Sequence, residues 1–136
     1  LRSEEVGALA SEVAAVPRVR ASLLLRQRAF KIRPGLVADG RDMGTVVFPE
    51  AQLKVYLTAS ADERAQRRYK QLKDKGEAVS LPRLVADIEA RDRRDTERSV
   101  APLRAAPGAV TVDTTGKGIQ EVFDLLMAEV KERGML

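Results

Sequence analysis

The sequence lacks cysteine and histidine altogether, and only 4% of its residues are aromatic. Without cysteine there are no disulfides, thiolate nucleophiles or Cys-based zinc sites. Without histidine the chain has neither the commonest metal ligand nor the one side chain whose unperturbed pKa lies near neutrality. Ser-His-Asp, Cys-His and HExxH chemistries are therefore excluded. Any catalysis by this chain must rely on carboxylates, hydroxyls, Arg, Lys and backbone groups.

Long apolar runs are also missing, since none approaches the ~20 residues that a membrane span requires. The opening residues, Leu1-Arg2-Ser3-Glu4-Glu5, do not resemble a signal peptide. We therefore expect a cytoplasmic protein without a membrane partner. Because the chain begins with Leu rather than Met, we expect its 136 residues to belong to a longer polypeptide.

Arginine dominates the charge that is present. The chain has 24 Lys plus Arg against 20 Asp plus Glu, for a formal charge of +4, and 17 of the 24 cations are Arg. The planar guanidinium matches phosphate and carboxylate better than an ammonium does. This surplus predicts a phosphorylated partner, and it leaves open whether that partner is a nucleotide or a nucleic acid.

Hydrophobic periodicity and turn residues predict strands that alternate with helices. Helices are expected from Ser3 to about residue 14, from Pro17 to about residue 33, from Ser60 to about Lys75, from Ser80 to Arg98 and over 119–130. Strands are expected at 36–38, where the run is short and buried, and at 53–57 and 109–112. This alternation is typical of an α/β fold with a largely parallel sheet.

The segment Asp39-Gly40-Arg41-Asp42 follows the first expected strand, and open α/β sheets bind ligands at the carboxyl ends of their strands. Gly40 permits a sharp turn, Arg41 can hold a phosphate, and Asp42 can accept a hydrogen bond from a ligand. An exposed turn with an internal Arg–Asp pair explains the same four residues equally well.

Two helical charge patterns have both a functional and an ordinary explanation. Arg91, Asp95 and Arg98 share one face, which would suit the hydroxyls and phosphates of a nucleotide. A solvated helix with ion pairs such as Asp87–Arg91 is the more usual outcome. Likewise, Arg67 and Arg68 lie in a charge run that is either solvated or part of a mobile lid over a triphosphate.

Residues 13–38 contain six cations and no acid, which would permit nucleic-acid binding. Phe30 is the only aromatic residue there, and this scarcity argues against stacking on single-stranded bases. A phosphate loop of the form GxxxxGK[ST] is absent. Gly116-Lys117-Gly118 lacks both the earlier glycine and the following Ser or Thr, so we predict a turn there.

Four stretches resemble the bacterial cytidylate kinases, which phosphorylate CMP and dCMP with ATP. They are SEVAAVPRVRASLLLRQRAF (11–30), GLVADGRDMGTVVFPEAQLKVYLTAS (35–60), ERAQRRYKQL (63–72) and IEARDRRDTERSVAPL (88–103). The resemblance covers essentially the whole chain. It implies a doubly wound parallel sheet of the P-loop nucleoside monophosphate kinase type, without the amino-terminal strand and glycine-rich loop of that family.

The resemblance also implies a role for each matching residue. Ser11, Arg20 and Asp42 match residues that recognise cytosine, and Arg41 matches the arginine that holds the CMP phosphate. Sugar and phosphate binding falls to Arg91, Asp95 and Arg98, and contact with the ATP phosphates falls to the lid residues Arg67 and Arg68. The catalytic set implied is Arg41, Arg67, Arg68, Arg91 and Arg98. The expected cofactor is Mg²⁺ bound with ATP, its protein ligands coming mainly from the region that this sequence lacks.

The same resemblance divides the chain into acceptor-side helices (1–33), core strands (34–59), lid helices (60–98) and a final strand with a helix (99–136). In such a sheet the strands at 35–39 and 52–57 flank the phosphate-loop strand, so its absence leaves a gap of about 10 Å between them. We expect the isolated chain to be inactive and the full-length kinase to be a monomer. The alternatives are a basic nucleic-acid-binding module and a non-catalytic acceptor half.

Overall fold

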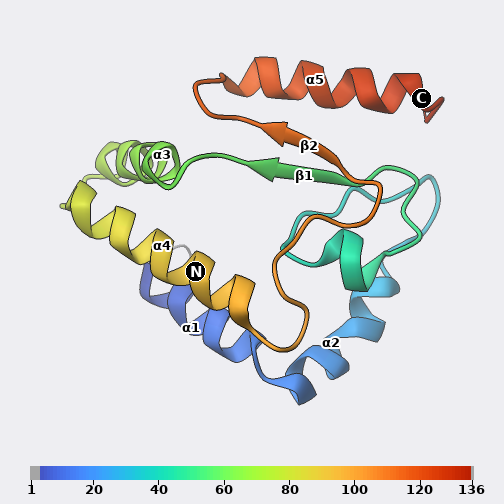
Figure 1. The fold of residues 1–136 in the computed structure, drawn as a ribbon, viewed down its shortest axis with the longest axis horizontal. Coiled ribbons are helices and arrows are strands. Elements are labelled where there is room, and N and C mark those ends of the chain that lie inside the picture. The colour runs from blue at the N-terminus through green and yellow to red at the C-terminus, as the bar shows by residue number, and fades with distance from the viewer. Residues whose placement is uncertain (1–3, 136) are drawn as a thin grey trace. The chain divides into compact units, whose positions relative to one another are not determined.

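A computed structural model describes residues 4–135 of the chain (Figure 1). Its helices are α1 (Glu4–Ala14), α2 (Pro17–Arg28), α3 (Ala61–Asp74), α4 (Leu81–Glu97) and α5 (Ile119–Glu132), with one π-helical turn, η1 (Met43–Val47). Its strands are β1 (Val55–Thr58) and β2 (Val110–Asp113). Ser3, predicted to open the first helix, lies outside the described residues. No helix in the described part of the chain is both long and apolar enough to cross a membrane.

The described residues form two compact units. The first consists of the residues up to Glu50 together with Ala90–Arg104, and it contains α1, α2, η1 and the carboxyl-terminal part of α4. The second consists of Ala51–Glu89 and the residues from Ala105 onward, and it contains β1, α3, β2, α5 and the start of α4. The candidate site residues are divided between these units.

In the first unit, α2 packs against both α1 and η1. Pro17 occupies the first turn of α2, where its missing N–H costs no hydrogen bond, so the predicted helix start is confirmed. The turn η1 follows Asp42 directly. The side chains of Val47, the last residue of η1, and of Phe48, which follows it, are buried and form much of the small apolar interior of this unit.

The predicted buried strand at 36–38 is wrong. These residues have no strand structure, and the Val37 side chain is fully exposed. An extended segment needs a neighbouring strand to satisfy its backbone hydrogen bonds. In the described part of the chain the sheet has two strands, β1 and β2, and they pair only with each other.

The second unit contains that parallel pair, in which Val55 lies opposite Val110 and Thr58 opposite Asp113. Figure 1 shows β1 and β2 side by side with the same direction. The strands predicted at 53–57 and 109–112 are thus confirmed, each with its end shifted by one residue. The parallel pairing agrees with the predicted mixed α/β class.

Helix α3 begins and ends where its sequence predicts. The Ser60 hydroxyl accepts a hydrogen bond of 3.1 Å from the Glu63 N–H, and Gly76 follows the helix with a φ of +76°. Leu72 and Ala65 of α3 are buried against Leu84 of α4. Helix α5 is also present as predicted, although Ile119 and Phe123 on its apolar face are exposed.

Candidate functional site

A buried carboxylate, Asp95, lies at the centre of the candidate site in the first unit. Its residue is only 1% exposed, and its Oδ1 accepts a hydrogen bond of 3.0 Å from the buried Ser11 hydroxyl of α1. A buried charge must be paired, because its desolvation otherwise costs several kcal/mol. The groups that pair with the Asp95 carboxylate therefore determine what this region can bind.

Three guanidiniums face the Asp95 carboxylate. Arg41 Nε donates to Oδ2, Arg91 Nε lies 3.9 Å from the same oxygen, and Arg98 Nη1 lies 3.6 Å from Oδ1. The spacing of Arg91, Asp95 and Arg98 on one helical face is confirmed. These three residues form a partly buried ion cluster, whereas a solvated face is usual for such a pattern.

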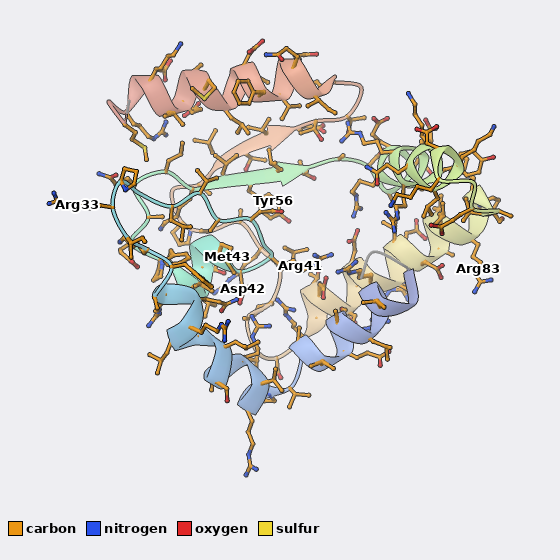
Figure 2. The ribbon with its side chains drawn as sticks, turned by 180° about the vertical axis from the view of Figure 1, so that it is seen from behind. Arg33, Arg41, Asp42, Met43, Tyr56 and Arg83 are labelled. Carbon is orange, nitrogen blue, oxygen red and sulfur yellow. The ribbon has the colours of Figure 1, made fainter. Side chains whose placement is uncertain are left out.

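A second carboxylate, Asp42, is also buried and pairs with Arg20 of α2. Arg20 donates as well to the carbonyl of Ala14, at 2.8 Å, at the end of α1. Figure 2 labels Asp42 and its chain neighbours Arg41 and Met43, and Asp42 directly precedes η1. Asp42 therefore bonds across to α2, whereas the alternative explanation had an Arg–Asp pair within the 39–42 turn.

Taken together, Arg20, Arg41, Arg91 and Arg98 outnumber the two carboxylates that pair with them. We call these six residues, with Ser11, the acceptor cluster. The excess of N–H donors over acceptors is most pronounced at Arg98, whose side chain is only 7% exposed. Its Nε donates to the Ala101 carbonyl at 2.6 Å, while Nη2 is buried with no hydrogen-bond partner among the described residues. Burial first, and then the positive charge of Arg20, lower the pKa of the Arg98 guanidinium below its usual value.

Sequence reasoning overlooked Arg94. Its Nη1 is buried and, within the described part of the chain, has no hydrogen-bond partner. Arg94 is three residues after Arg91 and four before Arg98, so helical spacing places it on the face that carries the other two. That spacing is the signal that could have identified it.

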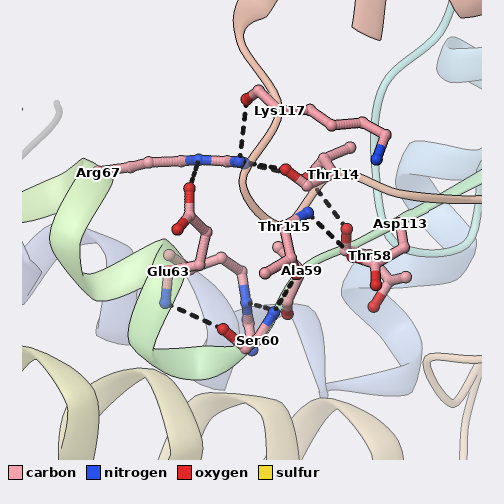
Figure 3. A network of polar contacts seen from close by, with 10 residues as sticks. Thr58, Ala59, Ser60, Glu63, Arg67, Asp113, Thr114, Thr115 and Lys117 are labelled. Carbon is pink, nitrogen blue, oxygen red and sulfur yellow. Dashed lines mark hydrogen bonds and ion pairs between the residues drawn. The ribbon is translucent and has the colours of Figure 1, made fainter.

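The predicted lid arginines lie in the second unit and have different surroundings. Arg67 of α3 donates to the Glu63 carboxylate at 2.9 Å, to the Thr114 hydroxyl at 3.0 Å and to the Thr114 carbonyl at 2.5 Å (Figure 3). The Lys117 carbonyl is a fourth acceptor, at 3.5 Å. We call this set of contacts the Arg67 network. The adjacent Arg68 makes a longer contact of 3.4 Å with the Gln71 side chain.

The loop after β2 is a turn, as its sequence predicts. Gly116 has a φ of +71°, a conformation that glycine adopts without strain, and Gly118 is the N-cap residue of α5. No group of three or more acidic residues in the described part of the chain could hold a metal ion.

The acceptor cluster is partly buried and has more guanidiniums than carboxylates, an arrangement whose chemistry suits a phosphorylated anion. The comparisons with known proteins specify the class further. The chain belongs to the cytidylate kinase family, which it matches over residues 1–132.

Its relatives include curated cytidylate kinases. The sequence is 58% identical to one from Marinomonas sp. (strain MWYL1) over all 136 residues, which is 60% of that relative's length. It is 60% identical to one from Pseudomonas fluorescens (strain SBW25), over 98% of this chain and 58% of the relative. The chain thus spans about 60% of the length of the relatives it matches. These matches confirm the family resemblance found in the sequence.

Proposed function

We propose that this chain carries the acceptor-nucleotide site and the lid arginines of an ATP-dependent kinase of CMP and dCMP. The observation that carries the proposal is the excess of guanidinium groups around Asp42 and Asp95, including the buried Nη2 of Arg98. A nucleoside monophosphate supplies what this cluster lacks, because its phosphate is a dianion that accepts several charge-assisted hydrogen bonds.

In this proposal the residues of the acceptor cluster have distinct tasks. Asp42, Arg20 and Ser11 recognise cytosine, whose exocyclic amine donates a hydrogen bond and whose N3 and O2 accept them. Arg41 holds the phosphate. Arg91, Asp95 and Arg98 bind the sugar and the phosphates, and Arg41 exchanges its bond to Asp95 for one to the incoming phosphate.

The reaction needs no general base, because the attacking CMP phosphate oxygen is already anionic. Phosphoryl transfer depends mainly on alignment and on neutralisation of charge at the transferring group. Arg41, Arg91 and Arg98 would provide that charge from the acceptor side. On the strength of the resemblance, Arg67 and Arg68 would provide it from the ATP side. Mg²⁺ is proposed to arrive bound to ATP, as part of that substrate.

The finer features of the fold belong to the same proposal. We infer that the complete protein has a doubly wound parallel sheet of the P-loop kinase type, in which residues 35–39, which have no strand structure in this chain, lie beside a strand from outside this sequence. We likewise propose that the chain is divided at 1–33, 34–59, 60–98 and 99–136. We also propose that the complete protein is cytoplasmic and monomeric. The exposure of Val37 supports the inferred sheet, because an apolar segment without a neighbouring strand is left uncovered.

The contacts of α2 argue against the nucleic-acid-binding alternative. Two of the six cations in residues 13–38, Arg20 and Arg28, direct their guanidiniums to Asp42 and to the carbonyls of Val46 and Val47. Their hydrogen-bonding groups are therefore already partly used within the protein, which leaves fewer of them for a nucleic acid.

The deciding experiment is a calorimetric titration with CMP, dCMP, UMP and AMP, with and without MgATP, together with an assay of nucleoside diphosphate formation. We expect the complete protein that carries this sequence to bind CMP in preference to AMP and to form CDP. The 136 residues alone should bind CMP weakly and transfer no phosphate. Salt-dependent binding of oligonucleotides with no response to CMP would overturn the proposal in favour of the nucleic-acid module.

A further inference from the structure

Arg28, at the last position of α2, makes two hydrogen bonds to one short segment of backbone. Its Nε donates to the carbonyl of Val47 and its Nη2 to the carbonyl of Val46, each at 3.0 Å. These carbonyls belong to the last two residues of η1, and carbonyls at the end of a helical turn have no partner within the turn. Arg28 supplies that partner, although it lies on the surface of the protein.

The opposite end of η1 is held by the same helix. Asp42 precedes η1, and its carbonyl accepts backbone hydrogen bonds from Val46 at 2.9 Å and from Val47 at 3.2 Å. Its side chain pairs with Arg20, which lies eight residues before Arg28 on α2. At about 3.6 residues per turn, eight residues correspond to two turns plus about 80°, so both arginines extend from the same half of the surface of α2. The five residues of η1 are thus held at both ends by arginines of one helix.

We propose that Arg28 is a positioning residue for nucleotide recognition. It holds the carboxyl-terminal end of η1 so that Asp42, at the other end, keeps its carboxylate directed at the base, and so that the neighbouring Arg41 keeps its place. The inference rests on the proposed function, and it adds a residue to which the family resemblance gave no role. Arg28 touches no substrate and acts only through the backbone of η1.

The fork of the guanidinium is essential to this role. Two neighbouring carbonyls are held by two N–H groups in a fixed plane, whereas a lysine ammonium at the same position is a point donor on a flexible stem. If Arg28 served only as a positive charge near the nucleotide, lysine would replace it. If Arg28 instead positions η1, lysine does not replace it.

The test uses Arg28→Lys and Arg28→Met in the complete protein that carries this sequence, with Arg26→Met as the matched control. Arg26 is an exposed arginine in the same last turn of α2. Both Arg28 variants should raise the KM for CMP by about fivefold, the size expected from the loss of one ordinary hydrogen bond. The KM for ATP should stay within twofold, and the preference for CMP over UMP should fall by a similar factor. Arg26→Met should change none of these values.

A second measurement separates positioning from simple loss of stability. In an Asp42→Asn background, Arg28→Lys should cause no further loss of CMP preference, because the group that Arg28 positions is no longer there to recognise the base. Selectivity in the Arg28 variants equal to that of Arg26→Met, or full rescue by lysine, would overturn the inference. If the unmodified protein forms no CDP at all, the proposed function fails instead, and the two failures are distinguishable. Should Arg28→Met fail to fold, Arg28→Lys and its double variant still decide the question.

Discussion

The acceptor cluster and the Arg67 network use the same side chain in opposite ways. In the acceptor cluster four guanidiniums are paired with two carboxylates, and Arg98 retains a buried N–H group with no partner among the described residues. In the Arg67 network one guanidinium has four oxygen acceptors from three residues. The family resemblance implied phosphate contacts for arginines of both sets.

The two sets therefore differ in the partners of their guanidiniums, although the residue type is the same. A guanidinium has five N–H donors, and those left without acceptors in a buried place favour an incoming anion. Arg67 has already used most of its donors, so it ties α3 to the loop after β2 in this structure. For Arg67 to reach a triphosphate, its bonds to Thr114 must first break.

The largest effect is expected for the carboxylate on which the acceptor cluster depends. Asp95→Asn keeps the shape and the acceptor for Ser11, yet it removes the charge that compensates three guanidiniums. Because Arg41 and Arg91 are partly exposed, we expect a loss near the lower end of the usual range, about 3 kcal/mol in the free energy of unfolding. Urea denaturation measures it.

The control is Asp87→Asn, on the same helix, where the ion pair with Arg83 is exposed and 3.9 Å long. It should cost less than about 0.5 kcal/mol. Equal effects of the two substitutions would contradict the central role of Asp95.

The next largest effect concerns activity rather than stability. Arg98→Met removes a buried cation whose pKa is already lowered by burial, so the free energy of unfolding should change by less than about 1 kcal/mol. The kcat/KM for CMP should fall about a hundredfold, as expected when charge-assisted hydrogen bonds to phosphate are lost. Arg93→Met, at an exposed position of α4, is the control in the same steady-state assay. An unchanged kcat/KM would remove Arg98 from the phosphate site.

Asp42→Asn tests base recognition. The substitution keeps the shape but replaces an accepting oxygen with a donor, so the preference for CMP over UMP should fall about tenfold. Binding of ATP should be largely retained. Competition assays with both nucleotides measure this ratio, and Asp39→Asn, at an exposed position three residues earlier, is the control. Undiminished CMP preference in Asp42→Asn would exclude Asp42 from reading the base.

The smallest effect separates the two adjacent lid arginines. Arg67→Met should lower the free energy of unfolding by about 1 kcal/mol, a value reduced because the Arg67 side chain is partly exposed. Arg68→Met should leave it nearly unchanged. Thermal unfolding of both variants measures the difference. A greater loss of stability from Arg68→Met would reverse the contrast drawn from their contacts.

Local signals in the sequence predicted most of the helices and both strands. Pro17 and Ser60 mark helix starts, and Gly76 marks a helix end, because their preferences act within a few residues of backbone. The segment at 36–38 shows the limit of this reasoning. Its apolar pattern is that of a strand, but strand formation depends on a hydrogen-bonded partner that local sequence does not specify.

The sequence indicated which residues belong to the candidate site better than it indicated which contacts they make. The spacing of Arg91, Asp95 and Arg98 places them on one face, and the resemblance added Ser11, Arg20, Arg41 and Asp42, whose pairing with that face crosses long stretches of chain. Arg28 could not be assigned, because its partners are backbone carbonyls, which leave no mark in a sequence. The difference between Arg67 and Arg68 likewise arises from the fold of the loop at Thr114.

The π-helical turn η1 also affects where this protein can gain or lose residues. Val47 donates to Asp42 and Phe48 to Met43, so each ring spans one residue more than in an α-helix. Removing a single residue from Met43–Val47 would leave a turn of ordinary α-helical size with its backbone bonds intact. The side chains that follow would then be rotated by about 100° around the axis, and Val47 and Phe48 would leave the interior. Insertions and deletions at this point are therefore constrained by the apolar contacts after the turn rather than by its hydrogen bonds.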